Sequence, residues 1–124
     1  MISINEVLNI HQELINRFGG RLGIRDIQLL ESALQRPFQT FDGKALYETP
    51  LEKAAALTES LLRNHPFIDG NKRVAYAVLR LFLKSTGYSI LAVQEQKYQF
   101  IIAVASGELT YAQIYQWIVA HTKR

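Results

Sequence analysis

A chain of 124 residues, with 48% hydrophobic and 20% charged side chains, suits one globular domain and leaves no length for a second. The absence of cysteine excludes disulfide cross-links and thiol chemistry, and it suits the reducing cytoplasm. The sequence shows no secretory signal and no apolar run near the ~18 residues of a membrane-spanning helix, and a net charge of +3 is weak evidence for a polyanionic partner. We therefore expect a single cytoplasmic domain over residues 1–124.

Two helices are predicted in the first third of the chain. Ser3 and Glu6 have the spacing of a capping box, and apolar residues then recur at helical period, which predicts a helix over residues 4–18. Asp26 is suited to cap a second helix, which we expect to end before Pro37.

Residues 36–48 have a different pattern, because their apolar positions show no helical period. Aromatic side chains lie on both sides of Asp42-Gly43, and this dipeptide is among the strongest short signals of a β-hairpin. The segment is therefore predicted to form two short strands or an extended flap.

Four more helices are predicted after the flap. Thr49-Pro50-Leu51-Glu52 combines an N-cap, a proline at the first helical position and the glutamate of a capping box. Proline after His65 forbids continuation of that helix. The helix that follows has the broadest apolar stripe and is expected to be central in the fold. The predicted ranges are 49–64, 71–86, 94–105 and a last helix from 110 to 121–124. The fold class is thus all-α, a compact bundle of about six helices with one small β-hairpin.

The loop at residues 65–73 reads His-Pro-Phe-Ile-Asp-Gly-Asn-Lys-Arg, and packing alone explains this composition poorly. Gly70 precedes a helix start, where backbone N–H groups lack intrahelical partners and favour an anion. Asn71, Lys72 and Arg73 would add an amide donor, a point charge and a planar guanidinium at the same place. We expect these four residues to bind the phosphates of a nucleoside triphosphate.

Two further side chains of the loop complete a candidate catalytic site. Asp69 is the only carboxylate among the cations, and a hard oxygen ligand beside phosphates suits Mg²⁺. His65 has the side chain best suited to act as general base for a hydroxyl group near neutral pH. Each residue alone has a structural explanation as a helix cap or turn, but their combination favours a site. His11 and His121 have no such neighbours, and we expect them to be ordinary surface or capping residues.

Residues 65–73 resemble, without a mismatch, the Fic/Doc family signature His-Pro-Phe-x-(Asp/Glu)-Gly-Asn-x-Arg. The resemblance implies an all-α enzyme in which His65 deprotonates a hydroxyl of a target protein and Asp69 holds Mg²⁺. It also implies that the flap, residues 36–48, binds an extended segment of the target as an added strand. The residues that it assigns to the phosphates of ATP are Gly70, Asn71 and Arg73.

Departures from the pattern of the AMP-transferring enzymes indicate a branch of the family. Lys72 replaces a glycine and Tyr76 replaces an arginine, and both changes resemble the Doc (death-on-curing) branch. A lysine there fills space that a diphosphate would use, which implies a reversed nucleotide that offers its γ-phosphate. Doc-like members are kinases of a threonine in elongation factor Tu, so the resemblance implies phosphorylation of a Ser/Thr hydroxyl and arrest of translation. Gly70 instead matches the AMP-transferring enzymes, because the Doc pattern has an alanine at this position. This leaves AMP transfer as the alternative.

The resemblance also implies a protein partner. Self-regulating Fic proteins carry an inhibitory Ser/Thr-x-x-x-Glu-Gly/Asn helix, and the chain has no such segment. Inhibition is therefore expected in trans, from an antitoxin with a disordered segment that folds on this protein. The chain would then be the toxin of a toxin–antitoxin pair.

Two other classes compete with this hypothesis. A nucleic-acid-binding helical module would use the basic group Lys72, Arg73, Arg80 and Lys84, but the same helix carries a broad apolar stripe that suggests burial. Nucleic acid is thus expected as a partner only through an antitoxin. A family member that binds nucleotide without turnover is the other class, and the intact His65 and Asp69 argue against it.

Overall fold

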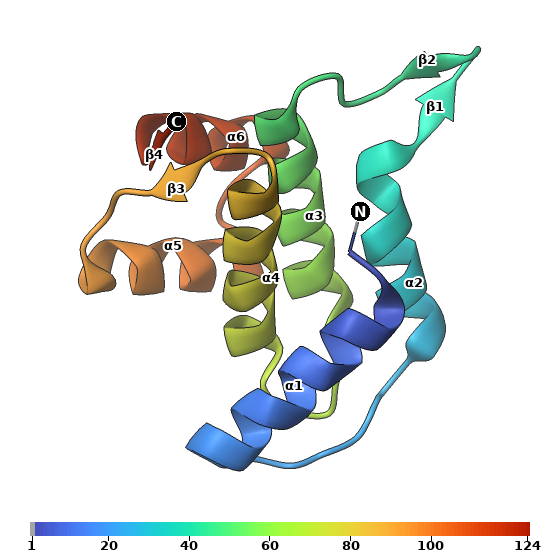
Figure 1. Ribbon diagram of the computed structural model, residues 1–124, viewed down its shortest axis with the longest axis vertical. Coiled ribbons are helices and arrows are strands. Elements are labelled where there is room, and N and C mark those ends of the chain that lie inside the picture. Colours follow the sequence, from blue (N-terminus) through green and yellow to red (C-terminus); the bar gives the residue numbers. More distant parts are fainter. Residues whose placement is uncertain (1) are drawn as a thin grey trace.

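All six predicted helices form in the computed structural model, which describes residues 2–124 (Figure 1). The predicted capping boxes are confirmed: Ser3 and Glu6 exchange hydrogen bonds, as do Thr49 and Glu52. These bonds satisfy N–H groups that have no partner within the helix. The bounds of the helices are α1 Ile4–Phe18, α2 Ile27–Gln35, α3 Pro50–Asn64, α4 Asn71–Ser85, α5 Gln94–Ala105 and α6 Tyr111–Ala120.

The predicted hairpin is confirmed and projects from the helices (Figure 1). Strands β1 (Thr40–Phe41) and β2 (Lys44–Ala45) pair antiparallel, and both Asp42 and Gly43 between them have positive φ, as a tight two-residue hairpin turn requires. The first residues of the predicted flap differ from expectation. They form a single 3₁₀ turn, η1 (Arg36–Phe38), because Pro37 fits the start of a helical turn, where its missing N–H is not needed.

A second β element was not predicted. Strand β3 (Ser89–Ile90) pairs antiparallel with β4 (Thr122–Lys123), so the prediction of only one β element is wrong. The last helix ends at Ala120, and the residues after it pair with β3 rather than extending the helix to the C-terminus. Strands of two residues are too short to show an alternating pattern, and their pairing depends on segments far apart in the sequence.

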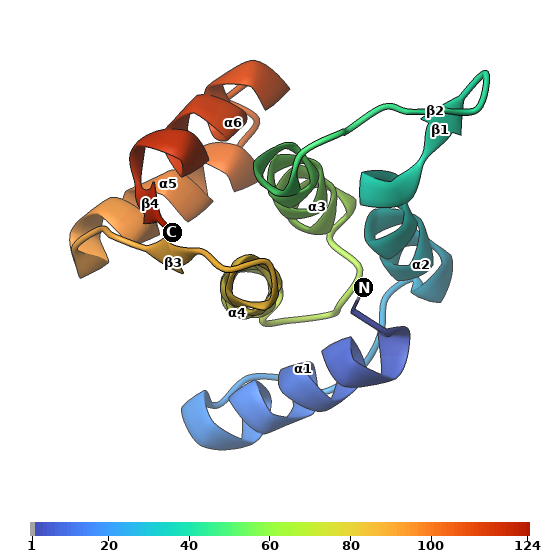
Figure 2. The ribbon, with the colours of Figure 1, turned by 45° about the horizontal axis from the view of Figure 1, so that its top comes forward.

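Helix α3, and not α4 as predicted from its stripe, lies at the centre of the fold. It contacts α2, α4, α5 and α6, which surround it in Figure 2. Every residue from Ala54 to Leu62 is buried, including three polar ones whose groups are satisfied internally. Those polar residues interrupt the apolar stripe, so hydrophobic periodicity underestimates how deeply this helix is buried. The polar residues are Thr58, Glu59 and Ser60.

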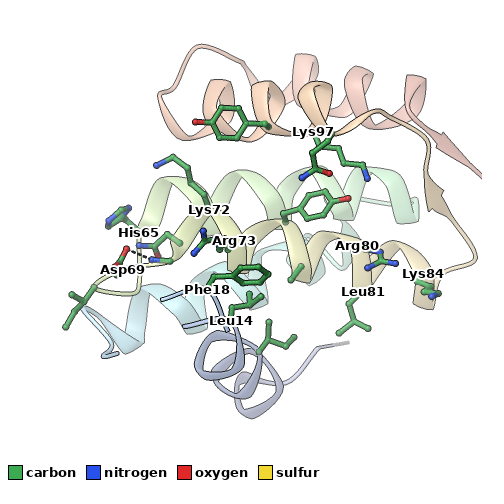
Figure 3. A pocket seen from close by; sticks show the side chains of 18 residues that line it. Leu14, Phe18, His65, Asp69, Lys72, Arg73, Arg80, Leu81, Lys84 and Lys97 are labelled. Carbon is green, nitrogen blue, oxygen red and sulfur yellow. Dashed lines mark hydrogen bonds between the residues drawn. The ribbon is translucent and has the colours of Figure 1, made fainter. Parts of the chain in front are cut away.

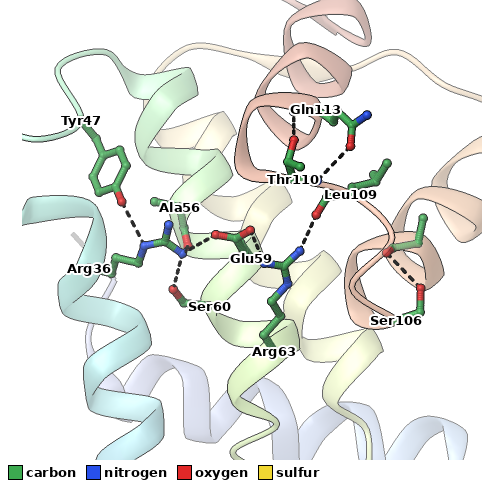
Figure 4. A network of polar contacts seen from close by, with 11 residues as sticks. Arg36, Tyr47, Ala56, Glu59, Ser60, Arg63, Ser106, Leu109, Thr110 and Gln113 are labelled. Atoms are coloured by element: carbon green, nitrogen blue, oxygen red, sulfur yellow. Dashed lines mark hydrogen bonds and ion pairs between the residues drawn. The ribbon is translucent and has the colours of Figure 1, made fainter.

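One buried carboxylate joins α3 to the base of the hairpin (Figure 4). Glu59 accepts from Arg36 at 2.8 Å through one oxygen and from Arg63 at 2.6 Å through the other. Arg36 also donates to Ser60 and to the hydroxyl of Tyr47, which follows β2. Because Arg36 precedes β1 and Tyr47 follows β2, this network fixes both ends of the hairpin to the central helix. We call these five residues the Glu59 network.

The helices of residues 2–124 include none that is long and apolar enough to cross a bilayer.

Replacing Glu59 by glutamine should destabilise the protein by about 2–4 kcal/mol, because two guanidinium groups would lose their only countercharge at a site that is mostly buried. Urea unfolding measures this change. Glu13→Gln, which changes an exposed residue of α1, is the matched control and should lie within about 0.5 kcal/mol of wild type. Equal stability of the two variants would show that the network does not hold the fold together.

Candidate active site

His65 caps the C-terminus of α3 in a left-handed conformation, with φ 50° and ψ 56°. This conformation is uncommon for a residue with a side chain, so the surrounding structure must hold it. Arg25 does so, because its guanidinium donates to the carbonyl oxygens of His65 at 2.7 Å and of Asn64 at 2.6 Å. The His65 side chain is exposed and lines a cleft. Sequence analysis missed Arg25, since nothing in its local pattern distinguishes it from an ordinary loop arginine.

The loop after His65 pairs with the segment that joins α1 to α2. The carbonyl of Pro66 accepts from the backbone N–H groups of Arg25 and Asp26, and Ile68 N–H donates to the carbonyl of Gly23. Phe67, between Pro66 and Ile68, is fully buried, as expected for an anchor. Residues 23–26 therefore act as a strand-like support that fixes the path of the loop.

Asn71 closes the loop from the other side. Its side chain is only 6% exposed, and it accepts from Phe67 N–H at 3.0 Å and donates to the Phe67 carbonyl at 2.9 Å. The amide was expected to donate to a phosphate, but here its N–H₂ group is engaged within the loop. What Asn71 offers to the cleft is its backbone N–H, one of the unpaired donors at the start of α4.

His11 lies beneath the same loop, although the sequence suggested an ordinary surface or capping residue. That prediction is wrong: His11 is 4% exposed, and its ring stacks on Phe67 with centroids 3.9 Å apart. Its Nε2 lies 2.8 Å from the carbonyl oxygen of Asp69, which can only accept, so this nitrogen carries the proton. Val7, His11 and Ile15 form the buried face of α1, and this four-residue spacing was the available signal.

The Asp69 carboxylate is exposed and held by two backbone donors. Its oxygens accept from the N–H of Arg21 at 3.1 Å and the N–H of Gly70 at 2.8 Å. These bonds, with that from Arg21 the larger cause, lower the pKa of Asp69 below its ordinary value, so the group is ionised near neutral pH. Gly20 permits this approach, since a β-carbon there would lie 2.8 Å from the carboxylate oxygen.

A cleft of about 1090 Å³ opens in front of these residues, between α1, α4 and α5 (Figure 3). Among the described residues that line it, Asp69 is the only carboxylate and five side chains are cationic. His65, Asp69, Lys72 and Arg73 gather at one end of it in Figure 3. The guanidinium of Arg73 lies 4.9 Å from the ring centroid of Phe18, so that it forms part of the wall. The cations are Lys72, Arg73, Arg80, Lys84 and Lys97.

The cleft offers one carboxylate, which suits a Mg²⁺ ion that is bound mainly by a nucleotide and water rather than by the protein. No group of three His, Cys, Asp or Glu side chains that could form a complete metal cage exists within residues 2–124. Mg²⁺ commonly binds through one or two carboxylates together with the phosphates of a nucleotide and water. The ionised, exposed carboxylate of Asp69 beside the cationic start of α4 meets this requirement.

The sequence model of the Fic/DOC family matches residues 1–83, which include all six predicted site residues. The chain is similar to "Toxin Doc" of Mycolicibacterium smegmatis, at 47% identity over 75 residues. That alignment covers 60% of this chain and 58% of the relative. It is also similar to "Protein kinase doc" of Escherichia phage P1, at 29% identity over 116 residues that cover 91% of this chain and 88% of the relative.

Replacing His11 by phenylalanine should keep the stack on Phe67 but leave the Asp69 carbonyl without its donor. We expect a loss of about 1–2 kcal/mol in unfolding free energy and a lower ATP affinity, since the loop that would hold the phosphates loses a support. Urea unfolding and calorimetric titration measure the two effects. His121→Phe, the same substitution at the end of α6, should leave ATP affinity unchanged. If both variants bind ATP like wild type, His11 does not position the loop.

The lowered pKa of Asp69 predicts a pH dependence of stability. Because the pKa is lower in the folded protein, the carboxylate stabilises the fold fully above its ordinary pKa near 4 and loses this effect as the pH falls through the folded value. The difference in unfolding free energy between wild type and Asp69→Asn should be constant from about pH 7 to about pH 5 and shrink below about pH 4. Urea unfolding across this range tests it, and a difference that persists unchanged at low pH would contradict it.

Proposed function

The chain belongs to the Fic/DOC family, and we propose that it is the toxin of a toxin–antitoxin pair, a kinase that transfers the γ-phosphate of ATP to a Ser or Thr hydroxyl. The observation that carries this proposal is the convergence of His65, Asp69 and the cationic start of α4 on one cleft. The similarity to a Doc toxin supports the toxin role, and the similarity to a protein kinase supports phosphate transfer.

The nucleotide phosphates would lie at the N-terminus of α4. Gly70 lines the cleft with φ 80°, a conformation that glycine adopts without strain, and a β-carbon there would lie 3.2 Å from Ile15 and 3.6 Å from His11. The first N–H groups of α4 and its macrodipole favour phosphate oxygens. Lys72 and Arg73, both exposed in the first turn, add a point charge and a planar guanidinium.

His65 would act as general base. Its imidazole accepts the proton of the target hydroxyl while the hydroxyl oxygen attacks the γ-phosphorus. The bond from the γ-phosphorus to the bridging oxygen then breaks, and ADP leaves with that oxygen. Asp69 would hold Mg²⁺, which would neutralise part of the negative charge of the phosphates. The left-handed backbone at His65, fixed by Arg25, sets the position of the base.

Lys72 supports transfer of the γ-phosphate rather than of AMP. It is the second residue of α4. By resemblance, its ammonium would compete for the space that a diphosphate would occupy if the α-phosphate were nearest to His65. A nucleotide bound in the opposite direction places its γ-phosphate there. AMP transfer remains the second candidate, because Gly70 matches the AMP-transferring pattern at a position where the Doc pattern has an alanine.

The target protein would bind along the hairpin. Its strands β1 and β2 are exposed, Phe41 is 70% exposed, and the Glu59 network fixes its base. An extended segment of the target added as a strand would lie against backbone groups that are free to pair. By resemblance we propose elongation factor Tu as the target, the cytoplasm as the location and an antitoxin acting in trans as the inhibitor.

The test is incubation of the protein with Mg²⁺, a bacterial lysate or purified elongation factor Tu, and ATP labelled on the γ- or the α-phosphate. We expect γ label on a protein band, reduced about 10²- to 10⁴-fold by His65→Ala, which is the usual contribution of general-base catalysis. His121→Ala, which removes the same side chain outside the cleft, should transfer label normally.

The other outcomes are equally informative. Transfer of α label that needs His65 would replace the kinase by an AMP transferase. Label that persists in His65→Ala would place the chemistry elsewhere, and no transfer with either label and either target would overturn the enzyme hypothesis.

A further inference from the structure

A second cavity, of about 410 Å³, lies at the far end of α4 from the catalytic loop. It is enclosed by the second half of α4, strand β3 and the beginning of α5. Three of its lining side chains are cationic, and none is a carboxylate. Figure 3 shows these three cations away from the end that holds His65 and Asp69. The residues that line the cavity are Tyr76, Arg80, Lys84, Tyr88, Ser89, Ile90, Gln94 and Lys97. We call it the distal cavity.

The charges of the distal cavity are not neutralised by the protein. Within residues 2–124 only two ion pairs form, and both belong to Glu59 on the other side of the molecule. The Lys97 ammonium lies 5.7 Å from the ring centroid of Tyr76, and the Arg124 guanidinium lies 5.2 Å from that of Tyr88. Cations that face a shared concavity without a countercharge raise its positive potential, which attracts an anion.

Favourable interaction with helix termini does not explain why all three cations of the distal cavity lie together. A cation in the last turn of a helix interacts favourably with the macrodipole, which explains Lys84. Arg80 lies one turn earlier, where this effect is weak, and Lys97 comes from α5. Two helices therefore contribute cations to one cavity.

The distal cavity is separate from the place proposed for the nucleotide phosphates. Lys84 follows Asn71 by 13 residues, which corresponds to about 20 Å along α4. The three cations also line the main cleft, so the two cavities adjoin. Residues 70–73 do not line the distal cavity, so an anion bound there would leave the proposed phosphate site free.

We propose that the distal cavity is a second anion site, which binds a small phosphorylated molecule other than the donor nucleotide. Arg80 can form paired hydrogen bonds to a phosphate, and Lys84 and Lys97 supply point charges. The hydroxyl group of Ser89 adds a neutral donor. The concave shape and small volume suit a compact phosphate rather than a nucleic-acid duplex. Tyr76, Gln94 and the three cations line both cavities, so the bound molecule would border the main cleft.

The test is a titration of the full ¹⁵N-labelled chain with inorganic pyrophosphate in the absence of divalent metal, followed by NMR. We expect saturable shifts of the backbone amides of Ser89 and Ile90, which persist when the chain is first saturated with ADP. R80Q/K84Q should weaken pyrophosphate binding at these amides at least about tenfold, as loss of two charge-assisted contacts implies. K97Q should weaken it as well.

The control removes the same charge elsewhere. R17Q/K44Q changes exposed cations of α1 and the hairpin, and it should bind pyrophosphate at Ser89 and Ile90 like wild type. The same spectra report whether each variant is folded. Shifts confined to residues 70–73, or shifts at Ser89 that are equal in R80Q/K84Q and wild type, would overturn the proposal. Loss of the distal shifts on saturation with ADP would also overturn it and would assign these cations to the donor nucleotide.

Discussion

Both hydrogen-bonding groups of the Asn71 side chain are engaged with the backbone of Phe67, and this pair of bonds sets the course of the chain between α3 and α4. Phe67 and Pro66 are buried, whereas His65 and Asp69 on either side of them are exposed. His65 and Asp69 reach the cleft because Phe67, midway between them, is drawn into the core. A single buried amide and one aromatic ring thus connect the hydrophobic core to the proposed chemistry.

The electrostatics of the cleft follow from the same arrangement. Helix α4 begins at the loop with unpaired N–H groups and carries Lys72, Arg73, Arg80 and Lys84 along the wall. The net charge of the chain is only +3, yet the one carboxylate among the described lining residues is Asp69. Positive charge is therefore concentrated where an anion would bind. The small net charge of the whole chain therefore does not reveal the strongly positive potential of the cleft.

Much of the fold could be predicted because the signals are local. The Ser3 and Thr49 caps, the Asp42-Gly43 turn and the proline after His65 each act on neighbouring residues, and the structure confirms the elements that they delimit. The prediction that Asp69, Gly70 and the cations adjoin one another rested on a contiguous loop, and all of them line one cleft.

The parts that were missed depend on contacts between distant segments. His11 meets Asp69 across 58 residues, and Arg25 meets His65 across 40. Nothing in the local pattern distinguishes Arg25, and the spacing of His11 with Val7 and Ile15 indicates burial but not its contact with Asp69. The pairing of β3 with β4 also leaves no local signal, because it joins two-residue strands that are separated by α5 and α6 in the sequence. Buried polar residues in α3 concealed its central position, because the partner that Glu59 and Ser60 share, Arg36, comes from another element.

Gly20 limits how this protein can vary. A β-carbon at that position would meet both the carboxylate of Asp69 at 2.8 Å and the methyl group of Ile15 at 2.9 Å, and its φ of 119° already disfavours any side chain. Substitution there would displace the proposed metal ligand without touching a residue of the nine-residue signature. In three dimensions the signature therefore extends to a glycine in the turn after α1. A search for the nine-residue motif alone would still match a variant that had lost its function through a change at Gly20.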